Sequence, residues 1–345
     1  MFARVRPFNL NDGVDLSSAV SIVSITQRGQ LMTITKPERR TGGGSERTEE
    51  FHFSFDKNFG TAVTQEEVFA EVSEFVQSAL DGYNVCLFSY GQTGSGKTYT
   101  MQGGVLCITT HFMICSLGLG NGSLRGIIPR AMEQVGRYKL QLEDKGWEYS
   151  MEVSFIEIYN ENVRDLLRDS SSDNNMRHEI KRDENGATYI SDITMLELNP
   201  NNPEEIEEIM ELASKYRSVG ATNMNELSSR SHAVFTLYLR AMQKEQQLAL
   251  NGTLNLVDLA GSERIEKSGA AGERAKEAIH INRSLAALAD VFTAIGNKQS
   301  FVPFRNSKLT YLLQPALSGE GKTLMVCTKR LPYIVLKRLT SAYCT

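Results

Sequence analysis

Cysteine is scarce in this sequence, and its spacing supports neither a disulfide framework nor a zinc site. The five cysteines are odd in number and contain no C-x-x-C pair, so we expect reduced thiols in a cytosolic protein. No apolar run reaches the roughly 20 residues of a membrane-spanning helix. The longest run, residues 105–120, is interrupted by Thr109, Thr110 and His111. No basic-then-apolar leader opens the chain, which predicts that the protein is not secreted.

The chain also has no large excess of positive or negative residues, with 37 Lys or Arg against 41 Asp or Glu. The formal net charge of -4 weighs against a general nucleic-acid binder, although a small net charge can hide a local basic patch. With 41% apolar and 23% charged residues, the 345-residue chain is typical of one large or two ordinary globular domains. We find no internal repeat and no sustained heptad, so a coiled coil that dimerises the native protein would lie outside this chain.

Helical and strand-like patterns alternate along the chain, which predicts an α/β domain. One helix should begin with a capping box formed by Thr64 and Glu67 and end at Gly82. A second should carry its apolar stripe from Ile279 and end near Gly296. The expected strands cover residues 84–90, 149–159, 234–239, 254–259 and 323–327.

The strongest local motif is GQTGSGKT at residues 91–98, directly after the expected strand 84–90. It matches G-x-x-x-x-G-K-[ST] in the strand–loop–helix setting that this motif requires. Backbone N–H groups of such a loop surround phosphate oxygens, and the helix N-terminus adds partial positive charge. Lys97 would reach the β- and γ-phosphates, and the Thr98 hydroxyl would bind Mg²⁺. Taken alone, the motif could also be a glycine-rich turn with a solvated lysine.

A phosphate-binding loop needs a second segment that helps to hold Mg²⁺ and contacts the γ-phosphate, and residues 254–261 have the composition of such a segment. The apolar run 254–257 delivers Asp258, and Gly261 follows shortly after. A carboxylate at the end of a strand fits the partner of a water bound to Mg²⁺, and the Gly261 N–H can approach the γ-phosphate because no Cβ obstructs it. Without the neighbouring loop, Asp258 would read as an ordinary residue of a turn.

Three further segments resemble kinesin motor domains. Residues 225–232 (NELSSRSH) resemble their switch I, residues 258–263 (DLAGSE) resemble their switch II, and residues 4–7 (RVRP) resemble their nucleotide-base motif. The resemblance covers about residues 2–104 and 124–327. It implies a P-loop NTPase fold of the kinesin type, α/β in class, with a central, mostly parallel eight-stranded sheet flanked by helices on both faces.

The resemblance also implies ATP and Mg²⁺ as cofactors and gives each site residue a role. Arg4 and Pro7 would border the adenine, and Tyr99 would pack against it. The expected nucleotide-binding residues are therefore Arg4, Pro7, Gly91, Gln92, Thr93, Gly94, Ser95, Gly96, Lys97, Thr98 and Tyr99. The expected metal ligands are Thr98, Ser229 and Asp258.

The expected catalytic residues lie in the two switches. Ser228 and Ser229 would close on the nucleotide and position the attacking water. Arg230 and Glu263 would form a bridge between the switches when the site closes, and Gly261 would contact the γ-phosphate. In-line attack on the γ-phosphate then depends mainly on positioning and electrostatics.

By resemblance, the partner is the microtubule, whose surface is acidic. Residues 264–308, here called the cationic segment, hold eight Lys or Arg against four Asp or Glu, which leaves the rest of the -4 chain at -8. Such a distribution suits steering towards an acidic partner. The contact candidates are Lys267, Arg274, Lys276, Arg305 and Lys308. For any one of them a solvated helix face is the alternative interpretation. The helix near residues 273–295 would couple phosphate sensing to this surface.

The blocks at 264–270, 311–315 and 318–325 look most like the C-terminal-motor kinesins, which are typically minus-end directed. This resemblance implies a protein of the cytoplasm and the microtubule cytoskeleton, including the spindle. Nucleic acid and membrane insertion are not expected. Direction depends on a neck that precedes the motor, so the sequence leaves it open, together with cargo and oligomeric state.

Two segments depart from the family pattern. Residues 105–120 are apolar where the family has a polar loop, and residues 328–345 stand where the family has N-I-S-P and a final helix. We therefore expect a kinesin-like motor domain over residues 1–327, with a truncated first strand, and a non-family tail over 328–345. Our hypothesis is that both segments are gene-model artefacts, which sequencing of the transcript would test.

The sequence thus predicts a microtubule-dependent motor ATPase that couples Mg-ATP hydrolysis to nucleotide-dependent binding and movement. One alternative is a catalytically impaired microtubule-binding module, favoured by the two departures and disfavoured by the intact motif residues Lys97, Arg230 and Glu263. Another is a P-loop ATPase or GTPase that acts on a different partner, disfavoured by residues 4–7 and the serine-rich switch I.

Overall fold

The computed structural model describes most of the chain. It covers residues 1–7, 23–26, 29–37, 48–107, 115–117, 122–168, 177–184, 188–199, 202–219, 229–263 and 273–330.

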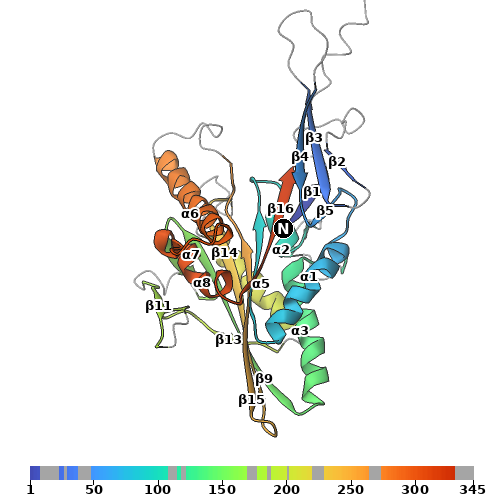
Figure 1. Ribbon diagram of the computed structural model, residues 1–345. Coiled ribbons are helices and arrows are strands. Elements are labelled where there is room, and N and C mark those ends of the chain that lie inside the picture. Colours follow the sequence, from blue (N-terminus) through green and yellow to red (C-terminus); the bar gives the residue numbers. More distant parts are fainter. Residues whose placement is uncertain are drawn as a thin grey trace, which may run out of the picture.

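A central sheet organises these residues (Figure 1). Its strands run in the order β10-β9-β14-β15-β6-β16-β1-β5, and β13 pairs with β9 as a ninth strand. Of the seven pairings along this path, the four from β15 to β5 are parallel and the three from β10 to β15 are antiparallel. The expected eight-stranded path is confirmed, and β13 is an addition that the sequence did not predict. The bounds are β1 (Phe2–Arg6), β5 (Lys57–Phe59), β6 (Asn84–Tyr90), β9 (Trp147–Tyr159), β10 (Asn162–Asp165), β13 (Leu196–Glu197), β14 (His232–Gln243), β15 (Leu248–Asp258) and β16 (Lys322–Arg330).

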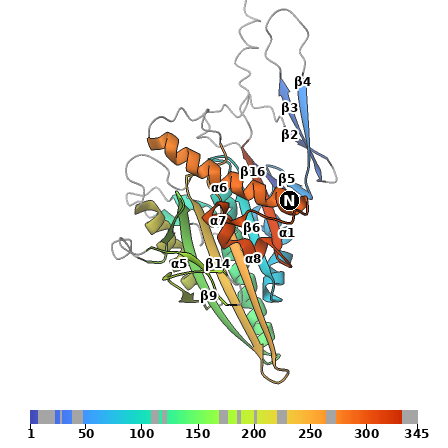
Figure 2. The ribbon, with the colours of Figure 1, turned by 60° about the vertical axis from the view of Figure 1, so that its left-hand side comes forward.

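Helices cover both faces of the sheet, as expected (Figure 2). One face carries α1 (Gln65–Leu80), α3 (Ile127–Glu143) and α5 (Pro203–Val219), and the other carries α6 (Glu273–Gly296), α7 (Lys308–Leu312) and α8 (Gln314–Leu317). Strand β6 shows the division, because Val85 and Leu87 belong to the first core whereas Cys86 and Phe88 belong to the second. Alternate side chains of a strand point to opposite faces, so β6 is buried on both sides.

Smaller elements surround this sheet. Strands β2 (Val23–Ile25), β3 (Leu31–Pro37) and β4 (Thr48–Ser54) form an antiparallel sheet that packs on β1 through Met32. Strands β11 (Ile180–Arg182) and β12 (Thr188–Ile190) pair with each other, as do β7 (Val105–Cys107) and β8 (Cys115–Leu117) within the apolar departure. Two further short helices are α2 (Lys97–Met101), which follows β6, and the 3-10 helix η5 (Phe304–Asn306), which precedes α7.

The predicted helix boundaries agree with the structure. Thr64 caps α1, its N–H donates to the Glu67 carboxylate at 2.7 Å, and the Glu67 N–H donates to the Thr64 hydroxyl at 3.2 Å. Gly82 follows the end of α1 with a φ of +96°, and Gly296 is the last residue of α6. Strand β16 continues to Arg330, beyond the expected 323–327, because its last residues pair with β1 through Arg6.

The crossing of α1 over β15 leaves no room for a side chain at Gly252. A Cβ there would lie 1.9 Å from the carbonyl oxygen of Ala79, a backbone atom that cannot move aside easily. We predict that Gly252→Ala lowers the free energy of unfolding by at least about 2 kcal/mol. At Gly296 a Cβ would meet nothing within 4 Å, so Gly296→Ala is the matched control and should change stability by less than about 1 kcal/mol. Urea unfolding of both variants checks this, and equal effects would contradict the described packing.

Candidate functional site

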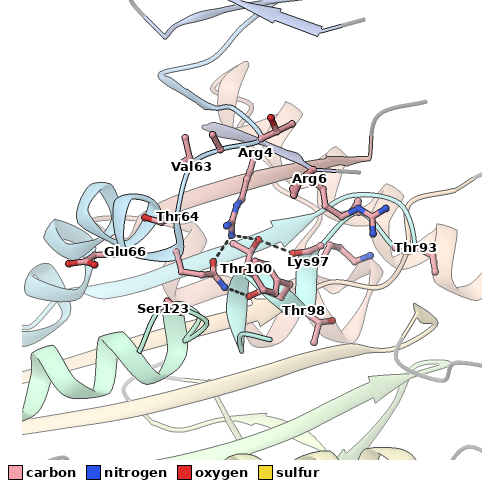
Figure 3. Close-up of a pocket in the computed structure, with 18 of the residues that line it drawn as sticks. Arg4, Arg6, Val63, Thr64, Glu66, Thr93, Lys97, Thr98, Thr100 and Ser123 are labelled. Carbon is pink, nitrogen blue, oxygen red and sulfur yellow. Dashed lines mark hydrogen bonds between the residues drawn. The ribbon is translucent and has the colours of Figure 1, made fainter. Parts of the chain in front are cut away.

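The loop of residues 91–96 lies at the carboxyl end of β6 and connects that strand to α2. A cavity of about 950 Å³ opens above it (Figure 3). The lining comprises Arg4, Arg6, Pro7, residues 61–66 and 93–100, Ser123 and Ser229. The structure therefore brings the two nucleotide motifs, 4–7 and 91–98, to one cavity. Gly91 and Gln92 begin the loop outside the lining, and the Gln92 carbonyl accepts a hydrogen bond from the Ser95 N–H at 3.1 Å.

Lys97 is a buried cation at the base of this cavity. Its side chain is almost inaccessible, and its ammonium donates to the Gln92 carbonyl at 3.2 Å. Burial lowers the pKa of Lys97, and the negative charges of Asp258 and Glu263 oppose that effect. A buried cation needs charged or polar partners, and phosphate oxygens would supply them. This is the environment expected for the lysine of a phosphate-binding loop.

Asp258 ends β15 directly beside the loop. Its Oδ2 accepts from the Thr98 hydroxyl at 2.6 Å and its Oδ1 accepts from the Ser89 hydroxyl at 3.2 Å. The carboxylate is buried, so these donors hold it in one orientation. Ser229, the third expected metal ligand, lines the same cavity. Hydroxyl and carboxylate oxygens are the ligands that Mg²⁺ prefers, so this donor set fits a magnesium ion.

The expected switches meet the loop at the same place. The N–H of Gly261 donates to the Ser229 carbonyl at 2.7 Å, and the N–H of Ser262 donates to the Gly91 carbonyl at 3.1 Å. A Cβ at Gly261 would lie 2.5 Å from the Thr93 hydroxyl and from the Glu263 carboxylate, so a larger residue there would displace these two side chains. Because the Gly261 N–H is engaged by Ser229, it reaches a phosphate only if that hydrogen bond is exchanged. Ser228 lies outside the described residues.

Glu263 contacts the phosphate-binding loop. Its carboxylate accepts hydrogen bonds from the N–H of Thr93, at 2.9 Å, and from the Thr93 hydroxyl. Burial acts to raise the pKa of Glu263, but these hydrogen bonds and the charge of Lys97 outweigh it, so the pKa is lowered. Arg230, the residue after Ser229 in the sequence, is half-buried. The Arg230–Glu263 bridge that the resemblance implies stays a prediction for a closed site.

The other end of the cavity is built around Arg4. This buried guanidinium donates to the side chains of Gln65, at 2.6 Å, and Thr100, at 2.9 Å (Figure 3). It lies 5.3 Å from the ring centroid of Tyr99, whose ring is partly exposed to the cavity. Burial lowers the pKa of Arg4, and Tyr99 opposes the shift. Pro7 lines the same end. The aromatic and guanidinium surfaces suit a flat base.

Sequence analysis missed a buried ionic cluster beneath the site. Glu157 is fully buried in β9, and Arg164 from β10 contacts it at 3.1 Å. Arg217 from α5 lies 3.6 Å from Glu157 and 3.4 Å from Asp258. The sequence did contain one indication of this cluster, the carboxylate of Glu157 inside the apolar run 154–159. A buried charge requires a partner of opposite sign, so this residue predicts a buried cation beside it. The identity of that partner depends on the fold.

His232 connects the site to α6. Its Nδ1 accepts from the Ala260 N–H at 3.1 Å, so Nε2 carries the proton and donates to the Ser284 hydroxyl at 2.6 Å. The imidazole is buried, and burial, followed by the charges of Arg217 and Lys97, lowers its pKa to about 3. His232 is therefore a neutral bridge between the end of β15 and α6.

Part of the cationic segment is described. Arg305 lies in η5 with its guanidinium 5.7 Å from the ring of Tyr311, and Arg182 from β11 lies 6.0 Å from the same ring. Lys308 begins α7, and its backbone N–H donates to Glu161 at 2.8 Å. The structure thus brings Arg305 and Lys308 together and adds Arg182, which the sequence did not single out. Lys267 lies outside the described residues, as do the side chains of Arg274 and Lys276.

Among the described residues, no helix is both long enough and apolar enough to cross a membrane.

Comparison with protein families gives one matching model, the kinesin motor domain, over residues 4–331. The chain is 45% identical over 335 residues to kinesin-like protein KIN-14N of Oryza sativa subsp. japonica, covering 94% of this chain and 39% of the relative. It is 44% identical over 328 residues to kinesin-like protein klpA of Emericella nidulans, covering 94% of this chain and 40% of the relative. The chain therefore spans about two fifths of the length of these curated relatives.

Solved structures agree with this match. The motor domain of the kinesin-like protein Kar3 from Saccharomyces cerevisiae superposes with a TM-score of 0.73 at 37% identity, covering 96% of this chain and 92% of that one. A C-terminal motor and motor homology domain of Kar3Vik1, fused to a synthetic heterodimeric coiled coil, gives 0.78 at 38% identity, with 99% and 82% covered. A fast kinesin, described for its ATPase mechanism and interactions with microtubules, gives 0.77 at 34% identity, with 95% and 84% covered.

The low pKa of His232 predicts a pH-dependent stability. Between pH 6.5 and 3 the folded state keeps this imidazole neutral whereas the unfolded chain takes up a proton. Stability from this group is therefore complete above about pH 6.5 and is lost as the pH falls, by up to about 1.4 kcal/mol per unit. Substitution by glutamine, His232→Gln, should flatten the dependence of the unfolding free energy on pH between 6.5 and 5. Urea unfolding at several pH values measures this, and an unchanged slope would show that His232 titrates normally.

Proposed function

The chain belongs to the kinesin family, with a kinesin motor domain over nearly its whole length, and from this premise we propose that it is a microtubule-stimulated motor ATPase. The observation that carries the proposal is that Lys97, Thr98 and Ser229 line one cavity, where the Thr98 hydroxyl donates to Asp258. The second switch contacts the loop at the same place, because the Ser262 N–H donates to the Gly91 carbonyl. The fast kinesin with a similar fold is described in terms of its ATPase and its microtubule interactions, which supports the same assignment here.

The proposed substrate is ATP with Mg²⁺. Arg4, Pro7 and Tyr99 would hold the base, and the N–H groups of the loop together with Lys97 would hold the phosphates. The hydroxyls of Thr98 and Ser229 and, through water, the carboxylate of Asp258 would hold the magnesium ion. When bound, the ion would neutralise charge on the β- and γ-phosphate oxygens. The loop positions proposed for phosphate binding are Gly91, Gln92, Thr93, Gly94, Ser95 and Gly96, of which Thr93 and Ser95 would have to release the N–H bonds that they now make to Glu263 and Gln92.

Hydrolysis would require the switches to rearrange. Ser228 and Ser229 would orient a water in line with the γ-phosphate. The Gly261 N–H would leave the Ser229 carbonyl, which it now contacts at 2.7 Å, and donate to the γ-phosphate. Glu263 would leave Thr93 and pair with Arg230, which closes the site. Each movement exchanges one hydrogen bond for another, so the cost of switching is small.

The proposed partner is the microtubule. Lys267, Arg274, Lys276, Arg305 and Lys308 are the proposed contacts, to which we add Arg182 because it shares the ring of Tyr311 with Arg305. The helix α6 packs with η5 and α7, which carry Arg305 and Lys308, and His232 bridges to α6 through Ser284. A change at the end of β15 could therefore be transmitted to the surface that binds the microtubule.

Because the chain spans about two fifths of the length of its curated relatives, its wider assignments are also proposals. We place the domain boundary near residue 327, with a departure at 105–120 and a distinct segment over 328–345. Dimerisation would use a coiled coil outside the chain, and the solved Kar3Vik1 motor is fused to one. We also propose location on the microtubule cytoskeleton of the cytoplasm, including the spindle, and minus-end direction, and the similarity to KIN-14 proteins supports both. Among the described site residues, no feature favours the catalytically impaired alternative.

Phosphate release by the purified chain, with and without microtubules, tests this proposal. The wild type should be stimulated strongly by the polymer. Substitution Thr98→Asn removes a hydroxyl that contacts Asp258 and should reduce the stimulated rate by at least about a hundredfold. The matched variant Thr98→Ser keeps the hydroxyl and should retain most of the activity. Turnover of GTP without any response to microtubules would favour a P-loop enzyme with another partner, and no turnover with retained microtubule binding would favour the impaired module.

A further inference from the structure

We infer that Thr328 is a positioning residue of the nucleotide site, which braces the phosphate-binding loop through Ser95. The inference rests on the proposed function, because it concerns how this chain holds a nucleotide. Thr328 lies just beyond the domain boundary that we propose near residue 327, within the span 4–331 that the kinesin motor model matches, and no sequence motif includes it. Its position in the fold places it beside the loop.

Strand β16 lies between β6, which leads into the loop, and β1, which carries Arg4. Thr328 is in register with Arg4 across the pairing of β16 with β1. The neighbouring residue of β16, Cys327, is in register with Tyr90, the last residue of β6. Since the loop starts at Gly91, Thr328 stands opposite the first residues of the loop and beside the strand that would hold the base.

The contact between Thr328 and the loop is direct and buried. The hydroxyl oxygens of Ser95 and Thr328 are 2.6 Å apart, and the two residues are 2% and 5% exposed. The Thr328 hydroxyl also donates to the carbonyl of Tyr90 at 3.3 Å. A hydroxyl has a single proton, so when Thr328 donates to Tyr90 it is the Ser95 hydroxyl that donates to Thr328. A directed chain of hydrogen bonds therefore runs from Ser95 through Thr328 to the end of β6.

A second contact fixes the start of the loop on the same residue. A Cβ at Gly91 would lie 2.3 Å from the Thr328 carbonyl oxygen and 2.6 Å from its hydroxyl. The loop thus packs on the backbone of β16 at Gly91 and is bonded to its side chain at Ser95. Further along the strand, the Arg330 guanidinium lies 3.8 Å from where a Cβ of Gly94 would be. The end of β16 supports the loop at three of its residues.

This support has a consequence for binding. The loop holds phosphate only if its N–H groups point into the cavity together, and a loop that must be ordered on binding has a lower affinity. Removing the Thr328 hydroxyl leaves a buried Ser95 hydroxyl and a Tyr90 carbonyl without this partner, which favours other loop conformations. The effect should appear in nucleotide affinity more than in the rate of the bound enzyme.

The test is the dissociation constant of a fluorescent ADP, with Mg²⁺ present, for the purified chain and its variants. Substitution Thr328→Val is nearly isosteric and should weaken binding by about tenfold, with kcat changed by less than about twofold. The variant Thr328→Ser keeps the hydroxyl and should bind within about twofold of the wild type. The matched control is Thr323→Val on the same strand, where the lost hydrogen bond of 3.1 Å goes to the Ala316 carbonyl, away from the loop. It should bind nucleotide normally.

A double-mutant cycle with Ser95→Ala separates a brace from a general loss of stability. If the Ser95–Thr328 bond carries the effect, the double variant should bind no more weakly than Thr328→Val alone. Independent, additive losses would overturn the inference, as would normal affinity of Thr328→Val or an equal loss in Thr323→Val. If the wild type itself binds no nucleotide, the proposed function fails, which is a different result. Thermal unfolding of each variant shows that the compared proteins are folded.

Discussion

The hydrogen bond between Thr98 and Asp258 is the interaction on which the site depends. It forms because β6 and β15 are parallel neighbours whose carboxyl ends meet at one edge of the sheet, with Asp258 in register with Ser89. The phosphate-binding loop leaves β6 at that edge, and the residues 259–263 leave β15 there. In an open α/β sheet this edge is where ligands bind. The chemistry of the site follows from the order of the strands.

Three groups of contacts fix this edge. Thr93 and Glu263 join the loop to the end of β15, and Ser229 joins both to the start of β14 through Gly261. The buried charges of Glu157 and Arg217 lie beneath Asp258, where they help to determine its orientation. His232 then connects the same edge to α6 through Ser284. In the proposed function, a nucleotide that alters this edge would act on α6 through this contact, which would provide a physical basis for coupling to a partner.

The sequence predicted the parts of this arrangement that are encoded locally. The phosphate-binding loop, the strand that delivers Asp258 and the capping box of α1 each depend on neighbouring residues, and all three are where the motifs placed them. Contacts between distant segments were not predictable in this way. Gln65 and Thr100 reach Arg4 from α1 and α2, and Thr328 reaches Ser95 across 233 positions. No periodicity or spacing in the sequence encodes such pairs.

The two segments that depart from the expected family pattern also differ in where they lie relative to the central sheet. Strands β7 and β8 form a short pair within residues 105–120, away from the central sheet. Thr328, in contrast, lies within the central sheet and contacts the phosphate-binding loop. The register of β16 places Thr328 beside the phosphate-binding loop, whereas β7 and β8 form a separate two-stranded sheet.

In the proposed function, the state of the nucleotide at this edge sets the affinity of the chain for microtubules. Co-sedimentation of the chain with microtubules tests it most directly, with saturating ADP in one series and a non-hydrolysable ATP analogue in the other. We expect the affinity for microtubules to differ between the two states by at least about fivefold, with tighter binding for the ATP analogue. Equal affinities, with both nucleotides shown to be bound, would contradict it.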